Sequence, residues 1–554
     1  MRVGLEELKN VLPKEKELTV IFPTGYGKTR FFTENKELLD KLGKTVHALP
    51  LQSIVSDFYQ DMKSKVGEEV GYQMALSIPE GDKRPYLSRK YMISTIDSFI
   101  LDFYGIPVHE IFRSKWHSDL ALLFARTSNI ILDEYHLITA VDVDDVDTEF
   151  NKVVKVVEDI RENALKKFII FTATLPRNLI NTKALVLAPD GHPFITDKMK
   201  PVWDPNDDFV SAFSGYTKSV KTYIDVGDRV SNIKKILKEN EGKKVLVMLN
   251  HVKDVEEVAS NIGCSFVHGL FTYESKQRIL SNLPECLVST QVIEAGVNLS
   301  FDVLITDVAP AFSLIQRAGR VLRSINDIGN KEGEIHILVD NVEEQVKGVY
   351  DLEVTKKTLE VLRKGEKDGH YEINWRLPEK EKMDYLKLIM GIEDSVRKVI
   401  EKANDDQGVS SFLYLLNNII LSPQKIIGNL DDLFQGSFIR SSSLVSMIVN
   451  GETASVSWFR FLKIMKGVKR MKFSYVSLNT VEEEKSIDVS IDDIIEDKPL
   501  TTMLRIIKKI RREEKVDDDL SGYLKVMPKG FIAPDEIVGE ENGLYYIRGS
   551  YHVG

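Results

Sequence analysis

The hydrophobic pattern between residue 18 and about residue 340 is a repeated alternation of short apolar runs with charged, amphipathic stretches. Short runs that are rich in β-branched residues and bounded by turn residues indicate buried strands, whereas the longer stretches have the apolar spacing of helices. The predicted strands form two sets: 18–22, 45–49, 91–94, 129–132 and 167–172, then 244–249, 265–268, 286–290, 303–306 and 334–339. Strands that alternate with helices build parallel sheets, so we predict an α/β fold with two similar parallel sheets in series.

A proline-containing segment separates the two sets of strands. Prolines recur through residues 188–208, which favours a linker with a hinge near residue 200. After about residue 345 the alternation ends, and the pattern predicts helices over 342–364 and 380–403 and strands over 473–488 and 544–553. We therefore expect a first domain over residues 1–200, a second over residues 201–345, and a C-terminal accessory α+β domain over residues 346–554.

The first predicted strand runs directly into a glycine-containing loop that precedes a helix. A phosphate-binding loop requires this order of strand, loop and helix, although a plain turn is the alternative. The backbone amides around Gly25 and Gly27 can wrap phosphate oxygens, Lys28 can reach the β and γ phosphates, and the Thr29 hydroxyl can ligate Mg²⁺. The residues expected to bind the nucleotide are Thr24, Gly25, Tyr26, Gly27, Lys28 and Thr29.

Two adjacent carboxylates, Asp133 and Glu134, follow the fourth predicted strand. Open parallel sheets bind ligands at the carboxyl ends of their strands. There Asp133 can hold Mg²⁺ through water, while Glu134 can orient and deprotonate the water that attacks the γ-phosphate. We expect His136 either to couple the nucleotide state to Thr172 and Thr174 or to fill a packed loop.

The second set of strands leads to a segment with three arginines. Arg320 and Arg323 lie three residues apart, so on a helix they would share one face and point together at a γ-phosphate held by the other domain. We expect both to act as arginine fingers. Gln316 would lie one helical turn before Arg320 on the same face, near the attacking water, whereas Arg317 is expected to be exposed or in a salt bridge.

Four motifs in this order are similar to motifs I, II, III and VI of the superfamily 2 helicases. They are P-T-G-Y-G-K-T from residue 23, D-E-Y-H from residue 133, T-A-T from residue 172 and Q-R-A-G-R-V-L-R from residue 316. The run S-T-Q-V-I-E-A-G-V from residue 289 resembles in particular the signature helicase of type I CRISPR interference. The resemblance covers residues 18 to about 340 and implies two tandem RecA-like domains that hydrolyse ATP between them.

The chain departs from this family at two points. Asn298 stands where the family usually has Asp. Many members also carry an N-terminal metal-dependent HD nuclease, whereas only 22 residues precede Pro23 and the sequence contains no His-Asp dipeptide. We therefore expect no nuclease activity in this polypeptide, as in the split form of the family, where the nuclease is a separate small protein.

By the same resemblance, contacts to the nucleic acid would come from residues at or near the ends of predicted strands. Small hydroxyls and backbone amides suit phosphate contacts that carry no base information. Ordinary turn capping is the alternative at each position. The candidates are Pro50, Ser53, Thr95, Asp97, Asn250, Ser289 and Thr290.

The amino-acid composition bears on how such a protein can bind nucleic acid and on the compartment in which it can act. The net charge of the 554 residues is −10, so a phosphate-binding surface has to be local and not spread over a basic domain. No run of about 18 uncharged apolar residues occurs, and we expect no membrane association. We interpret Cys264 and Cys286 as buried thiols in a reducing, cytoplasmic compartment. The aromatic and basic segment from Trp458 to Lys472 is either a base-stacking surface or an amphipathic packed element.

We predict an ATP-dependent translocase or helicase that acts on single-stranded DNA and uses ATP and Mg²⁺. The resemblance implies 3′ to 5′ movement, recruitment by a CRISPR RNA-guided surveillance complex, and a separate HD-type nuclease as partner. One alternative is a general DNA-repair or RNA helicase of superfamily 2, which would keep every ATPase residue. Another is a nucleotide-gated assembly module that docks a partner without unwinding.

Overall fold

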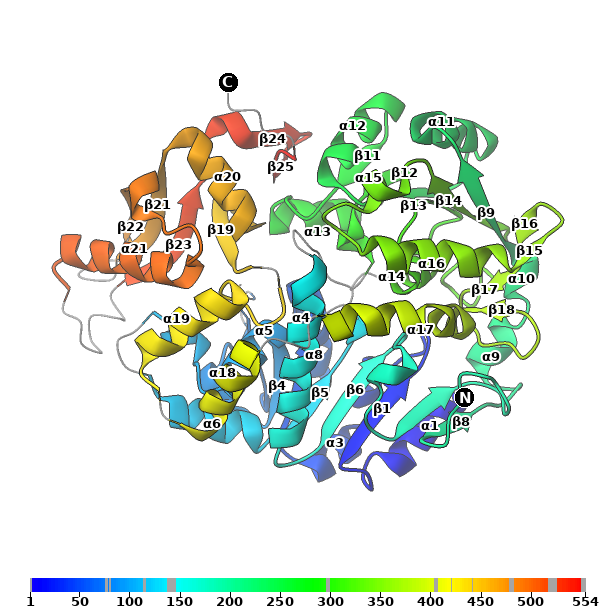
Figure 1. The fold of residues 1–554 in the computed structure, drawn as a ribbon, viewed down its shortest axis with the longest axis horizontal. Coiled ribbons are helices and arrows are strands. Elements are labelled where there is room, and N and C mark those ends of the chain that lie inside the picture. Colours follow the sequence, from blue (N-terminus) through cyan, green and yellow to red (C-terminus); the bar gives the residue numbers. More distant parts are fainter. Residues whose placement is uncertain are drawn as a thin grey trace.

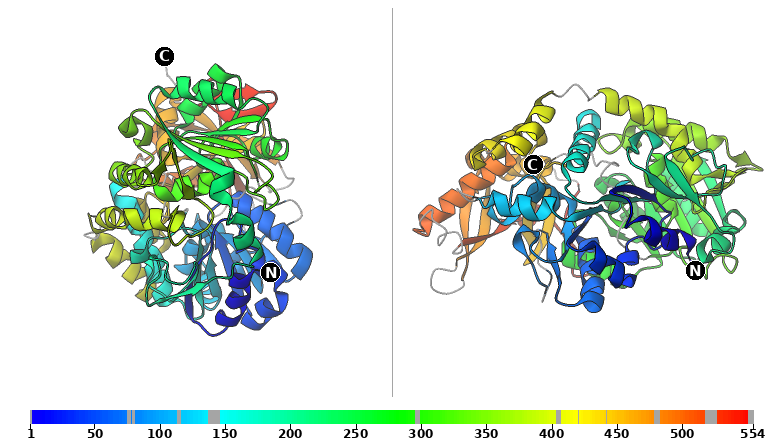
Figure 2. Two further views of the ribbon diagram at one scale, coloured as in Figure 1. Left: turned by 90° about the vertical axis from the view of Figure 1, so that its right-hand side faces the viewer. Right: turned by 90° about the horizontal axis from the view of Figure 1, so that it is seen from below.

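The computed structural model describes residues 2–74, 78, 81–112, 116–136, 146–294, 299–402, 407–419, 421–440, 442–477, 483–516 and 526–549. Figure 1 shows three parts: a first α/β domain at the bottom, a second above it, and a smaller C-terminal sheet beside them. Figure 2 shows the same arrangement from the side and from below, and in the view from below the C-terminal sheet (orange) projects from one end.

The first sheet has eight strands that all pair in parallel. The central strands are almost entirely buried, which explains their continuous Val, Ile, Leu and Phe content. The strand order is β3 (Val70–Gln73), β4 (Tyr91–Thr95), β2 (Thr45–Leu49), β5 (Asn129–Leu132), β6 (Phe168–Thr172), β1 (Glu17–Ile21), β7 (Ala184–Leu187) and β8 (Met199–Val202). The helices of this domain include α1 (Val3–Val11), α2 (Arg30–Glu34), α3 (Lys36–Leu42), α4 (Gln52–Val66), α5 (Ile96–Phe103), α6 (Ser118–Arg126) and α8 (Val146–Asn163).

The segment 188–208, expected to be a linker, contains the outermost strand of this sheet. Its residues Met199–Val202 form β8 and pair with β7. Pro201 is tolerated there because an edge strand leaves one row of its backbone groups outside the ladder. The hydrophobic pattern also missed the other edge strand, β3, because its four buried residues, Val-Gly-Tyr-Gln, do not form a continuous apolar run.

The second sheet repeats the parallel plan and then reverses at one edge. The strand order is β11 (Ser265–Val267), β12 (Cys286–Ser289), β10 (Val245–Met248), β13 (Val303–Asp307), β14 (Gly333–Val339), β9 (Val220–Val226), β16 (His370–Tyr371) and β15 (Glu366–Lys367), of which β16 and β15 are antiparallel. Its helices include α11 (Arg229–Glu239), α12 (Val252–Ile262), α13 (Tyr273–Ser281), α14 (Ala311–Ala318), α15 (Val342–Val346) and α16 (Leu352–Arg363). The prediction of two parallel-sheet domains with a C-terminal α/β region is confirmed.

The region after residue 380 divides into two parts with different cores. The helices α17 (Tyr385–Lys402), α18 (Gln407–Asn418) and α19 (Pro423–Phe434) contribute to the same hydrophobic core as the first domain. A second core belongs to a five-stranded sheet and to the helices packed on it. That sheet has the order β20 (Glu452–Ser457), β19 (Leu444–Val449), β23 (Val526–Ile532), β21 (Arg470–Ser477), β22 (Glu483–Ser490), and it is accompanied by α20 (Trp458–Val468), α21 (Pro499–Glu513) and the hairpin β24 (Val538–Glu541) and β25 (Leu544–Ile547).

The aromatic and basic segment from Trp458 is an amphipathic packed element. Trp458 and Phe461 are fully buried in the core of the C-terminal sheet, and their rings lie 5.2 Å apart. The basic side chains Lys463 and Lys469 stay exposed. The aromatic rings therefore stabilise the fold and are not available to stack on bases.

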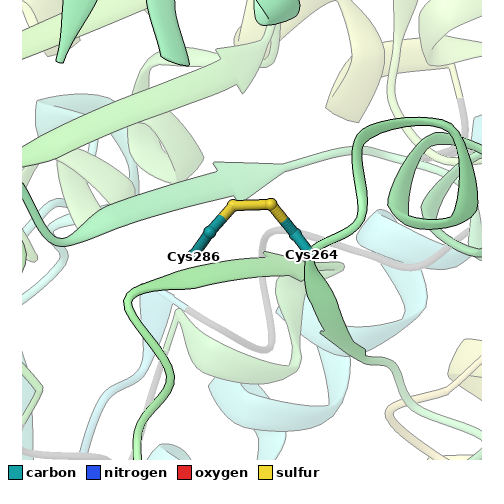
Figure 3. The surroundings of a disulfide bond; sticks show 2 residues. All are labelled: Cys264 and Cys286. Carbon is teal, nitrogen blue, oxygen red and sulfur yellow. A yellow bond between two sulfur atoms is a disulfide. The ribbon is translucent and has the colours of Figure 1, made fainter. Parts of the chain in front are cut away.

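The two cysteines form a disulfide bond, so the prediction of two buried thiols was wrong. Cys264 precedes β11 and Cys286 begins β12, and these are neighbouring parallel strands in which Ser265 pairs with Leu287 (Figure 3). The Cα atoms of the two cysteines are 5.3 Å apart, within the range that a disulfide spans. No local pattern predicts this pairing, because it depends on which strands are neighbours in the sheet. Among the helices that the structure describes, none has the length and apolar character needed to span a membrane.

Candidate active site between the two sheet domains

The predicted catalytic motifs of the first domain follow three neighbouring strands. The strands β5, β6 and β1 lie side by side, and all three point their carboxyl ends to the same edge of the sheet. The phosphate-binding loop follows β1, Asp133 and Glu134 follow β5, and Thr172 is the last residue of β6. The topology therefore brings three motifs that are far apart in the sequence into one site.

The loop after β1 has the backbone that a phosphate cradle needs. Gly25 and Gly27 have φ angles of +82° and +101°, which are unfavourable for residues with a Cβ atom. Lys28 is 4% exposed, and its Nζ donates hydrogen bonds to the carbonyls of Phe22, at 2.9 Å, and of Pro23, at 3.3 Å. The lysine charge is thus held within the loop, next to the amides that would wrap a phosphate.

The side chain of Tyr26 faces the protein and not the cradle. Its hydroxyl donates to Asp207 at 2.7 Å and accepts from the amide of Gly4 at 2.9 Å. Burial, together with the hydrogen bond to Asp207, raises the pKa of Tyr26, so the hydroxyl stays protonated. Of the expected nucleotide-binding residues, Tyr26 can therefore contribute only its backbone.

Thr29 and Asp133 form the pair that could hold a divalent cation. The Thr29 hydroxyl donates to Asp133 Oδ2 at 2.8 Å, and His47 Nε2 lies 3.1 Å from the same oxygen. Burial opposes ionisation of Asp133, but the hydrogen bonds from His47 and Thr29 and the charge of Lys28 outweigh it and lower the pKa of the carboxyl. Asp133 is thus a carboxylate at neutral pH, which is the form that Mg²⁺ prefers.

Glu134 has the geometry expected of a general base. It adopts a φ angle of +50°, and its Oε2 is buried without a hydrogen bond, 3.5 Å from His136 Nδ1. Burial raises the pKa of Glu134, while the positive charges of Lys28, Arg320 and Arg323 act against that rise. A carboxylate with a raised pKa is a stronger base, and a residue held in strained backbone geometry is often functional.

The residues expected to couple the nucleotide to movement lie in contact with one another. His136 Nδ1 is 3.3 Å from the Thr172 hydroxyl, which donates to the carbonyl of Thr174 at 3.1 Å. Burial and the charge of Lys28 lower the pKa of His136 to about 3, so its imidazole is neutral. A continuous path of contacts thus joins Glu134 to the end of β6.

The second domain contributes its candidate residues from α14 and the turn that follows. Gln316 lies on α14, and its Oε1 accepts a hydrogen bond from the Thr24 hydroxyl at 3.0 Å. The charges of Arg320 and Arg323 both act on the carboxyl of Glu134 in the first domain. The structure therefore brings the predicted arginines to the predicted base, across the interface between the domains.

Arg320 and Arg323 do not share a helical face, so the expectation of a continuous helix was wrong. The helix α14 ends at Ala318, and Leu322 has a left-handed φ of +42°. Residues 320–322 instead form a bridge to Phe301, whose amide donates to the Arg320 carbonyl at 2.9 Å and whose carbonyl accepts from the Leu322 amide at 3.0 Å. An isolated parallel bridge to Phe301, in the segment before β13, thus replaces the last helical turn.

Arg317 is fully buried, so of the two expectations for it the salt bridge is correct and solvent exposure is wrong. Its Nε donates to Glu294 Oε1 at 2.6 Å, and its terminal nitrogens donate to Thr306 at 2.9 Å and Asn250 at 3.0 Å. Arg317 therefore holds together the segments that follow several strands of the second sheet. Asn298, the position that departs from the family pattern, lies outside the described residues.

The buried polar atoms of the site test whether ATP and Mg²⁺ fit it. Within the described structure, Glu134 Oε2, Thr174 Oγ1 and Gln316 Nε2 are buried and make no hydrogen bond. Buried polar groups are normally paired, and unpaired ones gathered around a glycine-rich cradle fit a polar ligand with water. No group of three or more His, Cys, Asp or Glu among the described residues could hold a metal ion by itself. Thr29 and Asp133 fit an ion that takes its remaining ligands from phosphate and water.

The candidate nucleic-acid residues of the first domain follow β2 and β4, next to the catalytic strands. Thr95 caps α5, since its hydroxyl accepts from the amide of Ser98 at 3.4 Å. Asp97 accepts from Arg440 at 3.2 Å and from Ser437 at 3.2 Å, and Arg440 also donates to the carbonyl of Pro50 at 3.3 Å. Ser53 is partly exposed near the start of α4. Arg440 therefore brings two candidates together, Pro50 and Asp97.

The candidates of the second domain are buried. Asn250 is 3% exposed, and its side-chain amide donates to the carbonyls of Val308, at 2.9 Å, and Gln345, at 2.8 Å. The Ser289 hydroxyl donates to the carbonyl of Thr290 at 2.9 Å, and both residues are buried at the end of β12. The side chains of these residues thus support the fold of the second domain in the described arrangement.

Sequence reasoning missed three residues of these sites: His47, Arg376 and Arg440. His47 contacts Asp133, Arg440 contacts Asp97, and Arg376 donates to the carbonyls of Thr24 and Gly319. Each belongs to a segment without a recognisable motif, and Arg376 and Arg440 lie far along the chain from their partners. No local signal in the sequence could have identified them.

Comparisons with known proteins agree with the motifs. The family model of the DEAD/DEAH box helicase matches residues 5–182, and that of the CRISPR-associated nuclease/helicase Cas3, C-terminal, matches residues 241–326. The chain is 23% identical over 392 residues to the CRISPR-associated nuclease/helicase Cas3 of Methanothermobacter thermautotrophicus, covering 63% of this chain and 43% of that one. It is 25% identical over 361 residues to a putative CRISPR-associated nuclease/helicase Cas3 of Methanocaldococcus jannaschii, covering 57% and 45%.

Solved structures show the same fold. The crystal structure of T. fusca Cas3 with AMPPNP has a TM-score of 0.55 at 15% identity, covering 81% of this chain and 59% of that chain. A chain of a CRISPR RNA-guided surveillance complex, pre-nicking, has a TM-score of 0.50 at 17% identity, with 81% and 58% covered. The chain spans less than half of the length of the two curated relatives. The predicted resemblance is confirmed: in its motifs, its relatives and its fold, this chain is similar to the Cas3-type helicases of superfamily 2.

Proposed function

We propose that this chain is an ATP-driven translocase or helicase on single-stranded DNA, and that it serves as the helicase component of type I CRISPR interference together with a separate nuclease. The observation that carries the proposal is the meeting of two sets of charged side chains. Lys28, Asp133 and Glu134 of the first domain lie opposite Arg320 and Arg323 of the second, close enough for both arginines to act on the Glu134 carboxyl.

The first domain would bind the triphosphate. The amides of residues 25–29 would wrap its oxygens, and Lys28 would exchange the carbonyls of Phe22 and Pro23 for the β and γ phosphates. Thr29 and Asp133 would hold Mg²⁺, which neutralises charge on the phosphates when bound. The raised pKa of Glu134 and its unpaired Oε2 suit it to accept the proton of the water that attacks the γ-phosphorus.

The second domain would stabilise the charge that develops on the transferred phosphoryl group. Arg320 is buried and Arg323 is partly buried, so their guanidinium groups would act on the phosphoryl group in a site that is largely closed to water, where charges act strongly. Gln316, whose Nε2 has no hydrogen bond, could donate to the attacking water. Release of phosphate would remove the charge that draws the arginines in, and the domains would separate. The path from Glu134 through His136 and Thr172 to Thr174 would pass this change toward the nucleic acid.

The strand would run along the edge formed by the ends of β2 and β4. Asp97 cannot attract a phosphate because it is itself an anion, but it fixes the guanidinium of Arg440 at 3.2 Å. The side chain of Arg440 is 34% exposed, so its positive charge can attract a phosphate backbone. Contacts of this kind carry no base information and suit a motor that steps along any sequence.

The proposed partners rest on similarity. The chain of a CRISPR RNA-guided surveillance complex has the same fold, and the curated relatives bear the description of nuclease and helicase in one protein. We propose a separate HD-type nuclease as a partner by similarity to the split form of the family, in which the nuclease is a small protein of its own. A recruiting RNA-guided complex would deliver the opened DNA strand.

Steady-state ATP hydrolysis by the purified chain, without nucleic acid, with ssDNA and with ssRNA, tests the proposal. Lys28→Ala is the blank, and Lys235→Ala, at a lysine that is 70% exposed, is the matched control. We expect strong stimulation by ssDNA alone and displacement of an annealed strand. Equal stimulation by ssRNA would favour a general helicase. ATP-dependent binding of a partner without strand displacement would favour the assembly module.

A further inference from the structure

We propose that Arg376 is a positioning residue for ATP hydrolysis, which ties the phosphate-binding loop of the first domain to the turn that carries Arg320. This inference rests on the proposed function. Arg376 lies between β17 (Ile373–Asn374) and β18 (Met383–Asp384), after the last strand of the second sheet. No motif marks it in the sequence.

The guanidinium of Arg376 bridges the two domains. One terminal nitrogen donates to the carbonyl of Gly319 at 3.2 Å, and the other donates to the carbonyl of Thr24 at 3.2 Å. Gly319 directly precedes Arg320, and Thr24 directly precedes the first glycine of the phosphate-binding loop. A single planar side chain therefore sets the distance between the loop that would bind the phosphates and the arginine that would stabilise them.

The backbone of Arg376 is anchored to the second domain. The amides of Arg376 and Leu377 donate to Asn374 Oδ1 at 3.0 Å and 2.9 Å. The neighbouring Trp375 is buried and donates from its indole to Thr222 of β9 at 2.9 Å. The base of the side chain is thus fixed to the second sheet, and only its tip reaches the first domain. Opening of the interface would break the bond to Thr24 and keep the bond to Gly319.

Stability of the fold alone does not account for this arginine. Arg376 is 1% exposed, its Nε makes no hydrogen bond, and no ion pair joins it to a carboxylate among the described residues. Its guanidinium lies 4.3 Å from the ring centroid of Phe213. A buried cation with two carbonyls and an aromatic face but no counter-ion is costly for a folded protein. Burial lowers the pKa of Arg376 to about 10, so the cation persists at neutral pH.

Thr24 of the phosphate-binding loop makes a second hydrogen bond to the second domain. Thr24 donates from its hydroxyl to Gln316 and accepts at its carbonyl from Arg376. A Cβ placed on Gly319 would lie 3.8 Å from Thr24 Cβ, so the two backbones meet directly. Two polar contacts to one residue define a single closed arrangement. We infer that Arg376 selects this arrangement, and that it acts on catalysis through Arg320.

The test is a double-mutant cycle in the full chain with Arg376→Met, Arg320→Ala and both together. We expect Arg376→Met to lower kcat about 10- to 100-fold with KM changed less than about 3-fold, since it would misplace Arg320 at the transferred phosphoryl group without removing a contact to the nucleotide itself. The double variant should be no slower than Arg320→Ala, because Arg376 would act through that residue. Multiplied losses in the double variant, or an unchanged kcat in Arg376→Met, would overturn the proposal.

Two further variants separate positioning from folding. Arg376→Lys keeps the charge but can reach only one carbonyl, so its kcat should lie between wild type and Arg376→Met. Arg177→Met removes another contact between the first domain and the C-terminal region, the pair of Arg177 with Glu393 at 2.8 Å, and should keep the wild-type kcat. An equal fall of kcat in Arg177→Met and Arg376→Met would mean that both changes only loosen the fold.

A readout without turnover keeps this inference distinct from the proposed function. Fluorescent labels on α3 and α11 report the distance between the sheet domains. We expect a non-hydrolysable ATP analogue to hold wild type and Arg177→Met closed, and Arg376→Met to remain more open. Equal closure in Arg376→Met would overturn the role of Arg376. Absence of ATP hydrolysis by the wild-type chain would instead contradict the proposed function.

Discussion

The carboxyl edge of the first sheet contains two regions that differ in how their polar groups are satisfied. Around β5, β6 and β1, buried atoms such as Glu134 Oε2 and Thr174 Oγ1 make no hydrogen bond within the described structure. Around β2 and β4, the candidate residues are engaged by the protein itself, as Thr95 is by Ser98 and Asp97 is by Arg440. The first region leaves buried polar atoms that a ligand could pair, whereas the second pairs its polar groups with its own side chains.

The difference follows from the chemistry that each region would perform. A catalytic site has to present open donors and acceptors to one ligand, and the cost of leaving them unpaired is repaid when that ligand binds. A track for a strand has to hold a regular backbone without reading bases, so a scaffold that fixes one cation such as Arg440 is sufficient. Substitutions that remove a side-chain group from either region test this difference.

The largest expected effect is at the catalytic base. Glu134→Gln removes the proton acceptor and keeps the shape of the side chain, so kcat for ATP should fall roughly 10²- to 10⁴-fold while nucleotide still binds. Steady-state turnover and binding of a fluorescent ATP analogue measure the two quantities. Glu239→Gln, at an exposed position on α11, is the matched control. If Glu134→Gln hydrolyses ATP at the wild-type rate, Glu134 is not the base, and the difference between the two regions does not reflect catalysis.

The next effect is expected at the strand edge. Arg440→Ala should weaken ssDNA binding about 3- to 10-fold and lower the slope of log Kd against log salt by about 0.7, since one phosphate contact is lost. ATP hydrolysis without nucleic acid should be unchanged. Fluorescence anisotropy at several salt concentrations measures the binding, with Arg397→Ala on α17 as the control. An unaltered salt slope would show that Arg440 does not contact the strand.

A smaller effect is expected at Asn250, where we anticipate a loss of stability and not of binding. Its side chain accepts a hydrogen bond from Arg317 and donates to the carbonyls of Val308 and Gln345. Asn250→Ala would leave these buried groups without partners, which would lower the free energy of unfolding by about 1–3 kcal/mol. Thermal unfolding measures this loss, and Asn418→Ala on α18 is the control. If Asn250→Ala keeps its stability but loses ssDNA affinity, the second domain contacts the strand through this residue after all.

The last expected effect changes neither catalysis nor strand binding: it is a pH dependence of stability behind the strand edge. Asp102 on α5 is buried, and burial raises its pKa to about 7 from an ordinary value of 3.8. The folded state therefore holds a proton that the unfolded state has lost, so the stabilising contribution is complete below pH 4 and is lost as the pH rises through 7. That loss is about 1.4 kcal/mol per pH unit at most over this interval.

Asp102→Asn resembles the protonated carboxyl and cannot ionise. The gain in melting temperature over wild type should therefore grow from pH 5 to pH 7 and level off above pH 8. Thermal unfolding across this range measures it, and Asp119→Asn on the exposed face of α6 should show no such trend. A gain that is the same at pH 5 and pH 8 would mean that Asp102 ionises as an ordinary carboxyl does.

The sequence by itself determined the chemistry of the catalytic half. Lys28 and Thr29 are recognisable because they stand in one short loop between an apolar strand and a helix, and Asp133 and Glu134 because they end another apolar strand. Such signals are local, since hydrophobic periodicity and glycine positions report on a few consecutive residues. The two sheet domains were predictable for the same reason, and so were most of their central strands.

Only the tertiary structure decided which distant residues complete the sites. Arg376 and Arg440 meet partners more than 50 residues away, as the separations of 57 and 343 residues to Gly319 and Asp97 show. The disulfide depends on the pairing of β11 with β12, and the turn at Arg320 depends on its bridge to Phe301. Strand order and domain closure set these contacts. Both arise from packing between segments that are remote in the chain, where local propensity has no influence.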